Sequence, residues 1–265
     1  MTTPRTHATI DIGGLPVFYE TEGDGDPIVL LHGGLGDNST WAAQFSGFSP
    51  HRRVVAPERQ AQGHTPDAPG PLTYQAMTDQ TVRLLIALGL GPVDLLGWSD
   101  GGMVGTLIAA EHPELVRTLT VTGSGFSSAG YVPGAMEALV ALTPDDDDMA
   151  MFAAMYAHAS PDGPEHFPEV WKKVRTMWAE PFDWTAKVKR IVAPTLVICG
   201  DDDYITVAHA EEFSRTVKNG QLAVVPGASH VLPMEKPDLF NQLVLDFTAN
   251  PVPETMMPLR RKANH

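Results

Sequence analysis

The sequence predicts an α/β fold with a mostly parallel central sheet, helices on both faces of the sheet and one helical insertion. Continuously apolar runs of strand length, such as residues 28–31 (IVLL), are typical of strands that are buried on both faces. These runs alternate along the chain with segments whose apolar residues recur at helical spacing. The chain of 265 residues is 43% hydrophobic and 19% charged, so it is long and apolar enough to bury its own core.

The first expected element is an antiparallel hairpin at the edge of the sheet, formed by residues 8–12 and 17–21 around Gly13 and Gly14. Buried strands are then expected at residues 28–31, 54–56, 93–96, 119–121, 195–199 and 222–225. Helices are expected between them at residues 74–88, 103–111, 207–218 and 237–247. Glycine or proline stands near a boundary of each helix, as is usual where helices begin or end.

The alternation of strands and helices breaks once, between the strand at 119–121 and the strand at 195–199. The connection is roughly 70 residues long, whereas ordinary connections have about 2–6 residues. Residues 124–190 are therefore expected to form a helical cap, residues 1–123 and 191–250 the core domain, and residues 251–265 a C-terminal tail. The cap segment contains Trp171, Trp178 and Trp184, which either pack the insertion onto the core or shape a pocket.

Charge and composition restrict the partners. The 18 Lys and Arg against 32 Asp and Glu give a formal net charge of −14, which disfavours nucleic acids and anionic membrane surfaces. No metal-binding, paired-cysteine or phosphate-loop motif is present, so we expect no cofactor and no metal. The single cysteine, Cys199, lies in an apolar run and is expected to be a buried thiol. No apolar segment suits secretion or a membrane span, so we expect a cytoplasmic monomer or homodimer with a small-molecule substrate.

Residues 97–101 (GWSDG) carry the most informative motif. They follow an apolar strand and open a helix. In this context the G-x-S-x-G pattern predicts a nucleophile elbow, a sharp turn that exposes the serine hydroxyl at the end of the strand. Small residues at both ends of the pattern allow the backbone to turn this sharply. Ser99 is therefore the predicted nucleophile.

A serine nucleophile needs a base, and the base needs a group that orients it. Residues 199–203 (CGDDD) end one buried strand and residues 227–230 (GASH) end the next, so their side chains can meet Ser99 at the carboxyl ends of the strands. His230 is the predicted base. Asp203 is the predicted orienting acid, and the competing acids Asp201 and Asp202 are expected to be turn residues or helix caps.

Acyl transfer also needs hydrogen-bond donors for the oxyanion. Residues 31–36 (LHGGLG) follow the first buried strand, and we expect the N–H groups of Gly34 and Asp100 to form the oxyanion hole. His32 is expected to be a structural hydrogen-bonding residue. The Asp100 side chain has two possible roles, because it could pair with a cationic acyl group or cap the helix that it begins.

Taken together, the HGG loop at 32–34, the elbow at 97–101, Asp203 and the GASH segment ending at His230 resemble the α/β-hydrolase superfamily over nearly the whole chain. The resemblance implies an α/β-hydrolase fold with a cap. The elbow resembles that of valacyclovir-hydrolase-like (biphenyl-hydrolase-like) enzymes, and the layout resembles lactonases and cofactor-free haloperoxidases. One departure is that Gln60 and Ala61 stand where relatives usually carry Arg-Gly, so specificity is not transferable from a relative.

The expected function is that of a serine hydrolase, an esterase or lactonase that cleaves a small, mainly apolar carboxylic ester or lactone through an acyl-enzyme on Ser99. The acyl pocket is expected to be shaped by aromatic side chains of the elbow region and the cap: Trp98, Phe126, Trp171, Trp178 and Trp184. Two enzymatic alternatives use the same catalytic residues, namely hydrolysis of a carbon–carbon bond and perhydrolysis of the haloperoxidase type. A third alternative is a ligand-binding receptor that keeps the fold but turns over slowly.

Overall fold

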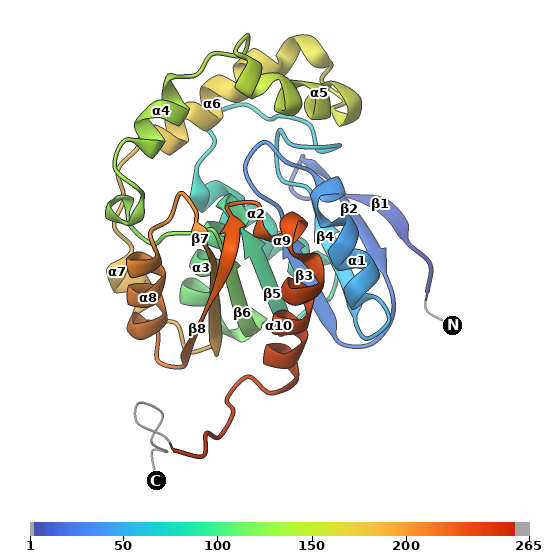
Figure 1. The fold of residues 1–265 in the computed structure, drawn as a ribbon. Helices are drawn as coiled ribbons and strands as arrows, with labels where there is room; N and C mark the ends of the chain where they lie inside the picture. Colours follow the sequence, from blue (N-terminus) through green and yellow to red (C-terminus); the bar gives the residue numbers. More distant parts are fainter. Residues whose placement is uncertain (1–2, 258–265) are drawn as a thin grey trace.

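A computed structural model describes residues 3–257 and confirms the predicted α/β class. Its single eight-stranded sheet has the order β1-β2-β4-β3-β5-β6-β7-β8 (Figure 1). The strands are β1 (Thr6–Asp11), β2 (Pro16–Glu22), β3 (Pro27–Leu31), β4 (Arg53–Pro57), β5 (Val93–Trp98), β6 (Val116–Thr122), β7 (Thr195–Asp202) and β8 (Gly220–Ser229). The pairs β1/β2 and β2/β4 are antiparallel and all other pairs are parallel, so the predicted edge hairpin is present.

Helices cover both faces of the sheet because the buried strands are apolar on both faces. In β3, Val29 and Leu31 belong to the core cluster beneath α2 (Tyr74–Ala87), α3 (Asp100–Glu111) and α8 (Val207–Thr216). Ile28 and Leu30 point to the opposite face and pack with α1 (Ala42–Phe48) and α10 (Pro237–Ala249). The alternation follows from the two-residue period of a strand. The sequence reasoning missed α1, which has only seven residues and therefore shows no helical period.

The parallel register aligns the carboxyl ends of the central strands at one edge of the sheet. Leu31 is paired with Gly97, Trp98 with Thr122 and Thr122 with Ile198. The loops that follow β3, β5, β6, β7 and β8 therefore leave the sheet side by side. This edge is where open α/β sheets place their ligand sites.

The insertion after β6 is mostly helical. It contains α4 (Ala135–Ala141), α5 (Ala150–Ala159) and α6 (Phe167–Ala179), which form an arc above the sheet in Figure 1. The buried side chains of α6 lie on one face: Phe167, Val170, Trp171, Val174 and Met177. Apolar residues at this spacing make α6 amphipathic. Its apolar face packs against α4 and α5. The last helix of the segment, α7 (Thr185–Val188), instead packs beside α3 and α8.

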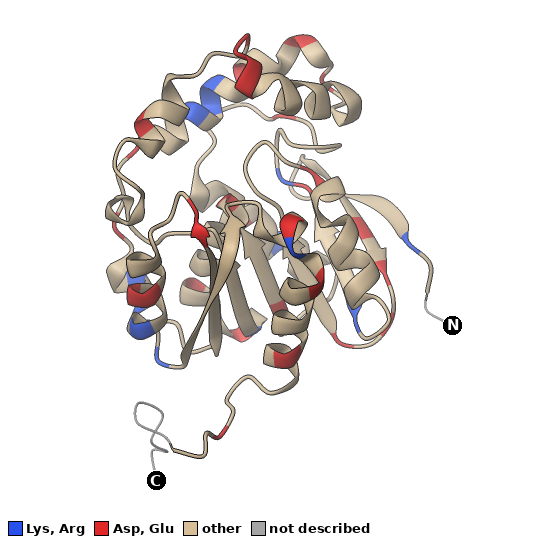
Figure 2. Ribbon diagram, in the orientation of Figure 1, with Lys and Arg blue, Asp and Glu red and all other residues tan. Residues whose placement is uncertain are grey.

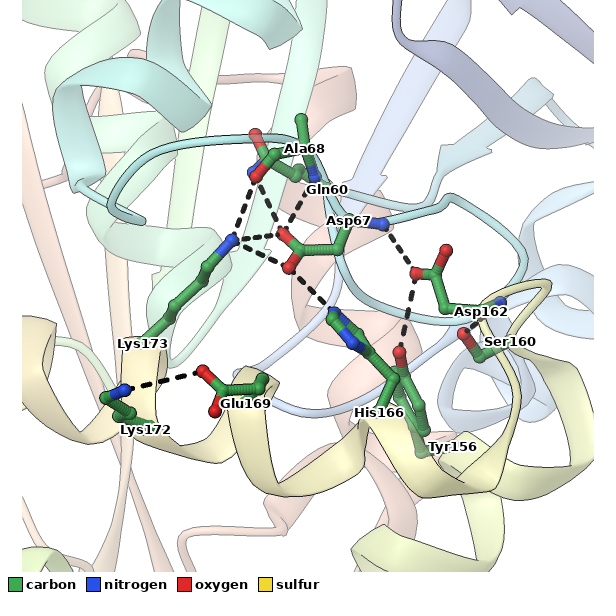
Figure 3. A network of polar contacts seen from close by, with 10 residues as sticks. All are labelled: Gln60, Asp67, Ala68, Tyr156, Ser160, Asp162, His166, Glu169, Lys172 and Lys173. Carbon is green, nitrogen blue, oxygen red and sulfur yellow. Dashed lines mark hydrogen bonds and ion pairs between the residues drawn. The ribbon is translucent and has the colours of Figure 1, made fainter.

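A polar cluster joins the cap to the loop after β4 (Figure 3). Lys173 Nζ of α6 donates to both carboxylate oxygens of Asp67 at 2.8 and 2.6 Å, and His166 Nε2 lies 2.9 Å from Asp67 Oδ2. Asp162 accepts a hydrogen bond from the Asp67 N–H at 2.7 Å. Burial by itself would raise the pKa of Asp67, but the hydrogen bonds from Lys173, His166 and Gln60 outweigh burial and lower it. The cap is thus fixed to the core by an ionised carboxylate.

The remaining short elements are α9 (Leu232–Glu235) and the 3₁₀ turns η1 (Asn38–Trp41), η2 (Pro113–Leu115), η3 (Ser128–Gly130), η4 (Asp147–Met149) and η5 (Pro164–His166). Of the predicted tail, residues 251–257 are in neither helix nor strand, and residues 258–265 lie outside the described residues. Acidic residues lie on both the cap and the core (Figure 2). Within residues 3–257, no helix has the length and apolar character that a bilayer span requires.

Candidate active site

Ser99 lies on a sharp turn between β5 and α3 and has a backbone φ of 54° and ψ of −123°. A positive φ is costly for a residue with a side chain, so the surroundings must enforce it. The Ser99 N–H donates to Thr122 O at 2.9 Å, and Ser124 Oγ donates to Ser99 O at 2.7 Å. Glycine is required on both sides, because a Cβ at Gly97 would lie 2.3 Å from Gly101 O and one at Gly101 would lie 1.9 Å from Leu31 O. This is the geometry of a nucleophile elbow.

The ends of β7 and β8 bring an acid and a base to the same point. His230 Nε2 lies 3.0 Å from Ser99 Oγ, and His230 Nδ1 lies 2.7 Å from Asp203 Oδ1. The Asp203 side chain is 1% exposed, whereas the His230 side chain is 21% exposed. The three side chains therefore form a continuous hydrogen-bonded chain from a buried carboxylate to an accessible hydroxyl, which is the arrangement that serine nucleophiles need.

The two competing acids occupy other positions. Asp201 Oδ1 accepts hydrogen bonds from the N–H groups of Gly227 at 2.7 Å and Ala228 at 3.3 Å, so it holds the loop that leads to His230. Asp202 is exposed and is paired with Ser229 in the sheet. Of the three aspartates, Asp203 is the one that hydrogen-bonds the imidazole of His230 in the described chain.

Gly123, the residue after β6, leaves room for the imidazole. A Cβ at Gly123 would lie 2.9 Å from both Cε1 and Nδ1 of His230, and Gly123 has a φ of 59°. Neither contact distance is possible without a shift of the ring. The β6 end therefore controls the position of His230 although it contributes no reactive side chain.

Gly123→Ala is expected to lower kcat by about 10²-fold, because misplacement of a catalytic group by about 1 Å has an effect of this size. Gly89→Ala is the matched control, since Gly89 also has a positive φ (63°) but a Cβ there would meet no atom within 4 Å. Both variants should lose about 1 kcal/mol of stability from the left-handed backbone. Ester turnover and thermal melting of the two variants check the prediction, which fails if both lose activity equally.

The loop after β3 approaches the elbow. Gly34 lies against Asp100 and the cap, since a Cβ at Gly34 would lie 2.4 Å from Asp100 Oδ2 and 2.6 Å from Trp178 Cζ2. In the described chain, the Gly34 N–H makes no turn or loop hydrogen bond to another backbone group. The Asp100 N–H belongs to the first turn of α3, where N–H groups have no partner within the helix. Both predicted oxyanion donors thus lie next to the Ser99 elbow.

The Asp100 carboxylate is buried and engaged. Oδ1 accepts a hydrogen bond from Tyr74 Oη at 2.7 Å, and the carboxylate accepts from Trp178 Nε1 at 3.1 and 3.0 Å. Asp100 makes no side-chain cap of α3. Burial raises the pKa of Asp100, while the Tyr74 hydrogen bond and the nearby Arg59 charge act in the opposite direction. The carboxylate joins α2 and the cap to the elbow.

The aromatic residues predicted for the pocket divide into two groups. The Trp98 ring lies 5.8 Å from the His230 ring and its Nε1 donates to His230 O at 2.7 Å. Trp178 Nε1 donates to the Asp100 carboxylate, and the Trp171 ring packs against the Trp178 ring with a centroid distance of 5.7 Å. Trp98 thus contacts the predicted base and Trp178 contacts the first residue of α3, whereas Trp171 packs against Trp178.

The other two aromatic residues predicted for the pocket, Phe126 and Trp184, pack against partners outside the group formed by Ser99, His230 and Asp203. Phe126 is 1% exposed and its ring stacks on His209 at 4.2 Å, because the chain after β6 turns toward α8. Trp184 lines a different cavity of about 440 Å³, together with Tyr74, Leu107 and Phe182. A second cavity of about 460 Å³ lies between η1 and α5 and is lined by residues such as Glu58, His64 and His158. Neither cavity is lined by Ser99, Asp203 or His230.

Sequence reasoning missed several residues around the elbow. Tyr204 packs edge-on against His230 at 5.1 Å, and Tyr131 hydrogen-bonds Met103 Sδ at 3.8 Å. Burial and the charges of Asp100 and Asp203 raise the pKa of Tyr131 above its ordinary range, so it is neutral. Tyr74 was expected only as the start of a helix, and no local motif distinguishes these tyrosines.

Cys199 is buried in β7, and burial raises the pKa of its thiol to about 11. A thiol with this pKa is protonated at neutral pH and cannot serve as a nucleophile. Across residues 3–257, no group of three His, Cys, Asp or Glu side chains is placed to hold a metal ion.

Comparisons with known proteins agree with this geometry. A model of the alpha/beta hydrolase family matches residues 28–243. The chain is 27% identical to the serine hydrolase BPHL of Mus musculus, with 92% of this chain and 87% of that protein covered. It is 24% identical to a putative carbamate hydrolase, RutD, of Azorhizobium caulinodans, with coverages of 89% and 96%.

Two solved structures are also similar. A serine hydrolase involved in carbazole degradation, the CarC enzyme, has a TM-score of 0.78 at 25% identity, with 92% of this chain and 99% of that chain covered. The enol-lactonase from Burkholderia xenovorans LB400 has a TM-score of 0.75 at 24% identity, with coverages of 92% and 100%. At this identity the second likeness concerns the fold alone.

Proposed function

Because the chain belongs to the alpha/beta hydrolase family and is a hydrolase, we propose that it is a serine hydrolase that cleaves a small, uncharged carboxylic ester or lactone through an acyl-enzyme on Ser99. The observation that carries this proposal is the hydrogen-bonded chain from Asp203 through His230 to Ser99 Oγ, with distances of 2.7 and 3.0 Å. A strained elbow presents that hydroxyl at the carboxyl edge of the sheet.

In the proposed reaction, His230 Nε2 takes the proton of Ser99 as Oγ attacks the substrate carbonyl carbon. Asp203 accepts from Nδ1–H, which keeps Nε2 free to act as the base, and it stabilises the imidazolium that forms. The N–H groups of Gly34 and Asp100 receive the oxyanion. His230 then protonates the leaving alcohol, and water, activated by the same imidazole, releases the acid from Ser99.

The preference for an uncharged acyl group is inferred from the state of Asp100. Its carboxylate already accepts hydrogen bonds from Tyr74 and Trp178, and Arg59 supplies a positive charge nearby. A cationic amine would have to displace these donors and would meet a charge that is already balanced. The contacts of Trp98 with His230 and of Trp178 with Asp100 support the proposal that these two aromatic side chains bind a small apolar acyl group.

The names of similar proteins support hydrolysis of an acyl bond. They include a putative carbamate hydrolase and a serine hydrolase. Carbamates, lactones and esters all pass through a tetrahedral oxyanion when a nucleophile attacks the carbonyl carbon. The observations therefore favour an acyl-bond hydrolase over a ligand-binding receptor, because a receptor does not need an accessible base next to a serine hydroxyl.

A substrate panel with active-site labelling tests the proposal. A fluorophosphonate is expected to label one site, Ser99, as located by peptide mass. The kcat/KM for a neutral short-chain p-nitrophenyl ester or a lactone is expected to exceed that for an α-amino ester of equal size by about tenfold, which corresponds to roughly 1.4 kcal/mol. Absence of labelling would contradict the serine mechanism. A preference for the amino ester would contradict the proposal that the acyl group is uncharged. Turnover of a carbamate alone would show that the substrate is a carbamate and not an ester or lactone.

A further inference from the structure

We propose that Arg59 is a positioning residue of the oxyanion hole, which fixes the Gly33 carbonyl and balances the negative charge of Asp100 beside Gly34. This inference rests on the proposed function. It concerns a residue that contacts neither Ser99 nor His230 in the described structure, and that lies in the loop after β4. The evidence is the set of contacts of Arg59, the position of Asp100 and the burial of both side chains.

Arg59 holds the loop that follows β3 at two points. Its Nη2 donates to Gly33 O at 3.0 Å and to Gln62 Oε1 at 3.3 Å. Its backbone N–H donates to His32 Nε2 at 3.3 Å, so the proton of the neutral imidazole is on Nδ1, which donates to Gly33 O at 2.7 Å. Burial, and then the Arg59 charge, hold the pKa of His32 well below its ordinary value, so His32 stays neutral. The Gly33 carbonyl thus receives two donors and the next peptide, that of Gly34, is fixed.

The buried negative charge of Asp100 would destabilise the proposed oxyanion unless a positive charge nearby offsets it. Its carboxylate is buried against Gly34, where the proposed oxyanion forms. A negative charge at this place would oppose the development of a second one in the transition state. Arg59 Nη2 donates to Gly33 O and Asp100 Oδ2 lies against the next residue, Gly34, so the guanidinium and the carboxylate flank the same loop. Although burial lowers the pKa of Arg59 to about 10, the guanidinium remains protonated at neutral pH. Its positive charge therefore offsets that of Asp100.

The cost of burying Arg59 supports an electrostatic role. The residue is 3% exposed, and its Nε and Nη1 atoms have no hydrogen-bond partner among the described residues. Burying such donors on a charged group is unfavourable, and an apolar side chain of similar length would pack at least as well. The contribution of this position is therefore the charge and the Nη2 hydrogen bond to Gly33, both directed at the proposed oxyanion loop.

The test is a double-mutant cycle with Arg59→Met, Asp100→Asn and the double variant. Arg59→Met is expected to lower kcat for a neutral ester by about 30-fold, a fraction of the loss seen when an oxyanion donor is removed. Its KM should stay within about threefold, because the effect concerns the transition state. The affinity for a trifluoromethyl ketone, which mimics the oxyanion, should fall in parallel with kcat. Addition of Asp100→Asn should recover at least about fivefold of the kcat loss, because the uncompensated charge is removed.

Arg59→Lys, which keeps the charge but not the planar fork, should lie between wild type and Arg59→Met. Arg215→Met on the exposed end of α8 is the matched control and should leave turnover unchanged. A double variant no more active than Arg59→Met, or a loss confined to KM, would overturn the proposal. If Arg59→Met does not fold, Asp100→Asn decides alone: tighter binding of the ketone supports the proposal and weaker binding overturns it. Fluorophosphonate labelling of wild-type Ser99 separates these outcomes from failure of the serine mechanism.

Discussion

Ser99→Ala is expected to reduce kcat/KM for a short-chain p-nitrophenyl ester by at least about 10⁴-fold and to abolish fluorophosphonate labelling. The effect is large because no other described hydroxyl is hydrogen-bonded to His230. Loss of a serine nucleophile removes covalent catalysis and leaves only the contribution of binding and the oxyanion hole. The variant should fold normally, since alanine removes one partly exposed oxygen and no core contact.

The control for this variant is Ser46→Ala on α1, whose exposed Oγ bonds only to Ala43 O at 3.1 Å. It should leave both turnover and labelling unchanged. Steady-state kinetics and mass spectrometry of the labelled protein make the measurement. Retained turnover or labelling in Ser99→Ala would place the nucleophile elsewhere and remove the basis of the proposed function.

Asp203→Asn is expected to lower kcat by about 10³- to 10⁴-fold with little change in melting temperature. An asparagine has nearly the same shape, but its amide does not hold the imidazole in the tautomer that leaves Nε2 free, and it does not stabilise the imidazolium. The short contact of 2.7 Å between His230 Nδ1 and Asp203 Oδ1 is the interaction that the change removes.

Asp202→Asn is the matched control because Asp202 is the neighbouring residue, is exposed and makes no hydrogen bond to His230 among the described residues. It is expected to keep kcat within about threefold of wild type, as surface changes usually do. Equal losses in the two variants would show that Asp203 has no special role. In addition, the Ser99→Ala/Asp203→Asn double variant should be no slower than Ser99→Ala, since groups that act as one unit are not additive.

Local sequence patterns predicted most of the fold. The apolar run at residues 28–31 and its counterparts correspond to strands β3 to β8, and in β3 to β7 the reason is that a strand buried on both faces must be apolar throughout. The prediction of a buried strand at 222–225 was wrong in one respect, because β8 is the edge strand of the sheet and its Val224 is 39% exposed. The elbow at Ser99 was equally accessible, since the positive φ of Ser99 and the close approach of Gly97 to Gly101 both lie within one pentapeptide. Helix α1 was missed because seven residues are too few to show a period.

Contacts between distant segments were not accessible in the same way. The sequence offered two roles for the Asp100 side chain, and the structure shows a third, as the acceptor for Tyr74 and Trp178. Phe126 was predicted as an aromatic residue of the acyl pocket, and the structure shows its ring stacked on His209, which lies 83 residues later in the chain. The contact of Arg59 with Gly33 was also not predictable, since Gly33 lies 26 residues earlier in the chain.

The sequence by itself determined the α/β alternation, the edge hairpin, the length of the insertion and the residue types at each strand end. These properties depend on the period of apolar residues and on turn chemistry, which act over a few positions. Only the tertiary structure decided which tryptophans of the cap reach the elbow, and that the Asp100 carboxylate is buried and accepts hydrogen bonds from Tyr74 and Trp178. Such outcomes depend on the parallel alignment of strand ends and on the way the cap packs over them, and both bring together residues that no local pattern connects.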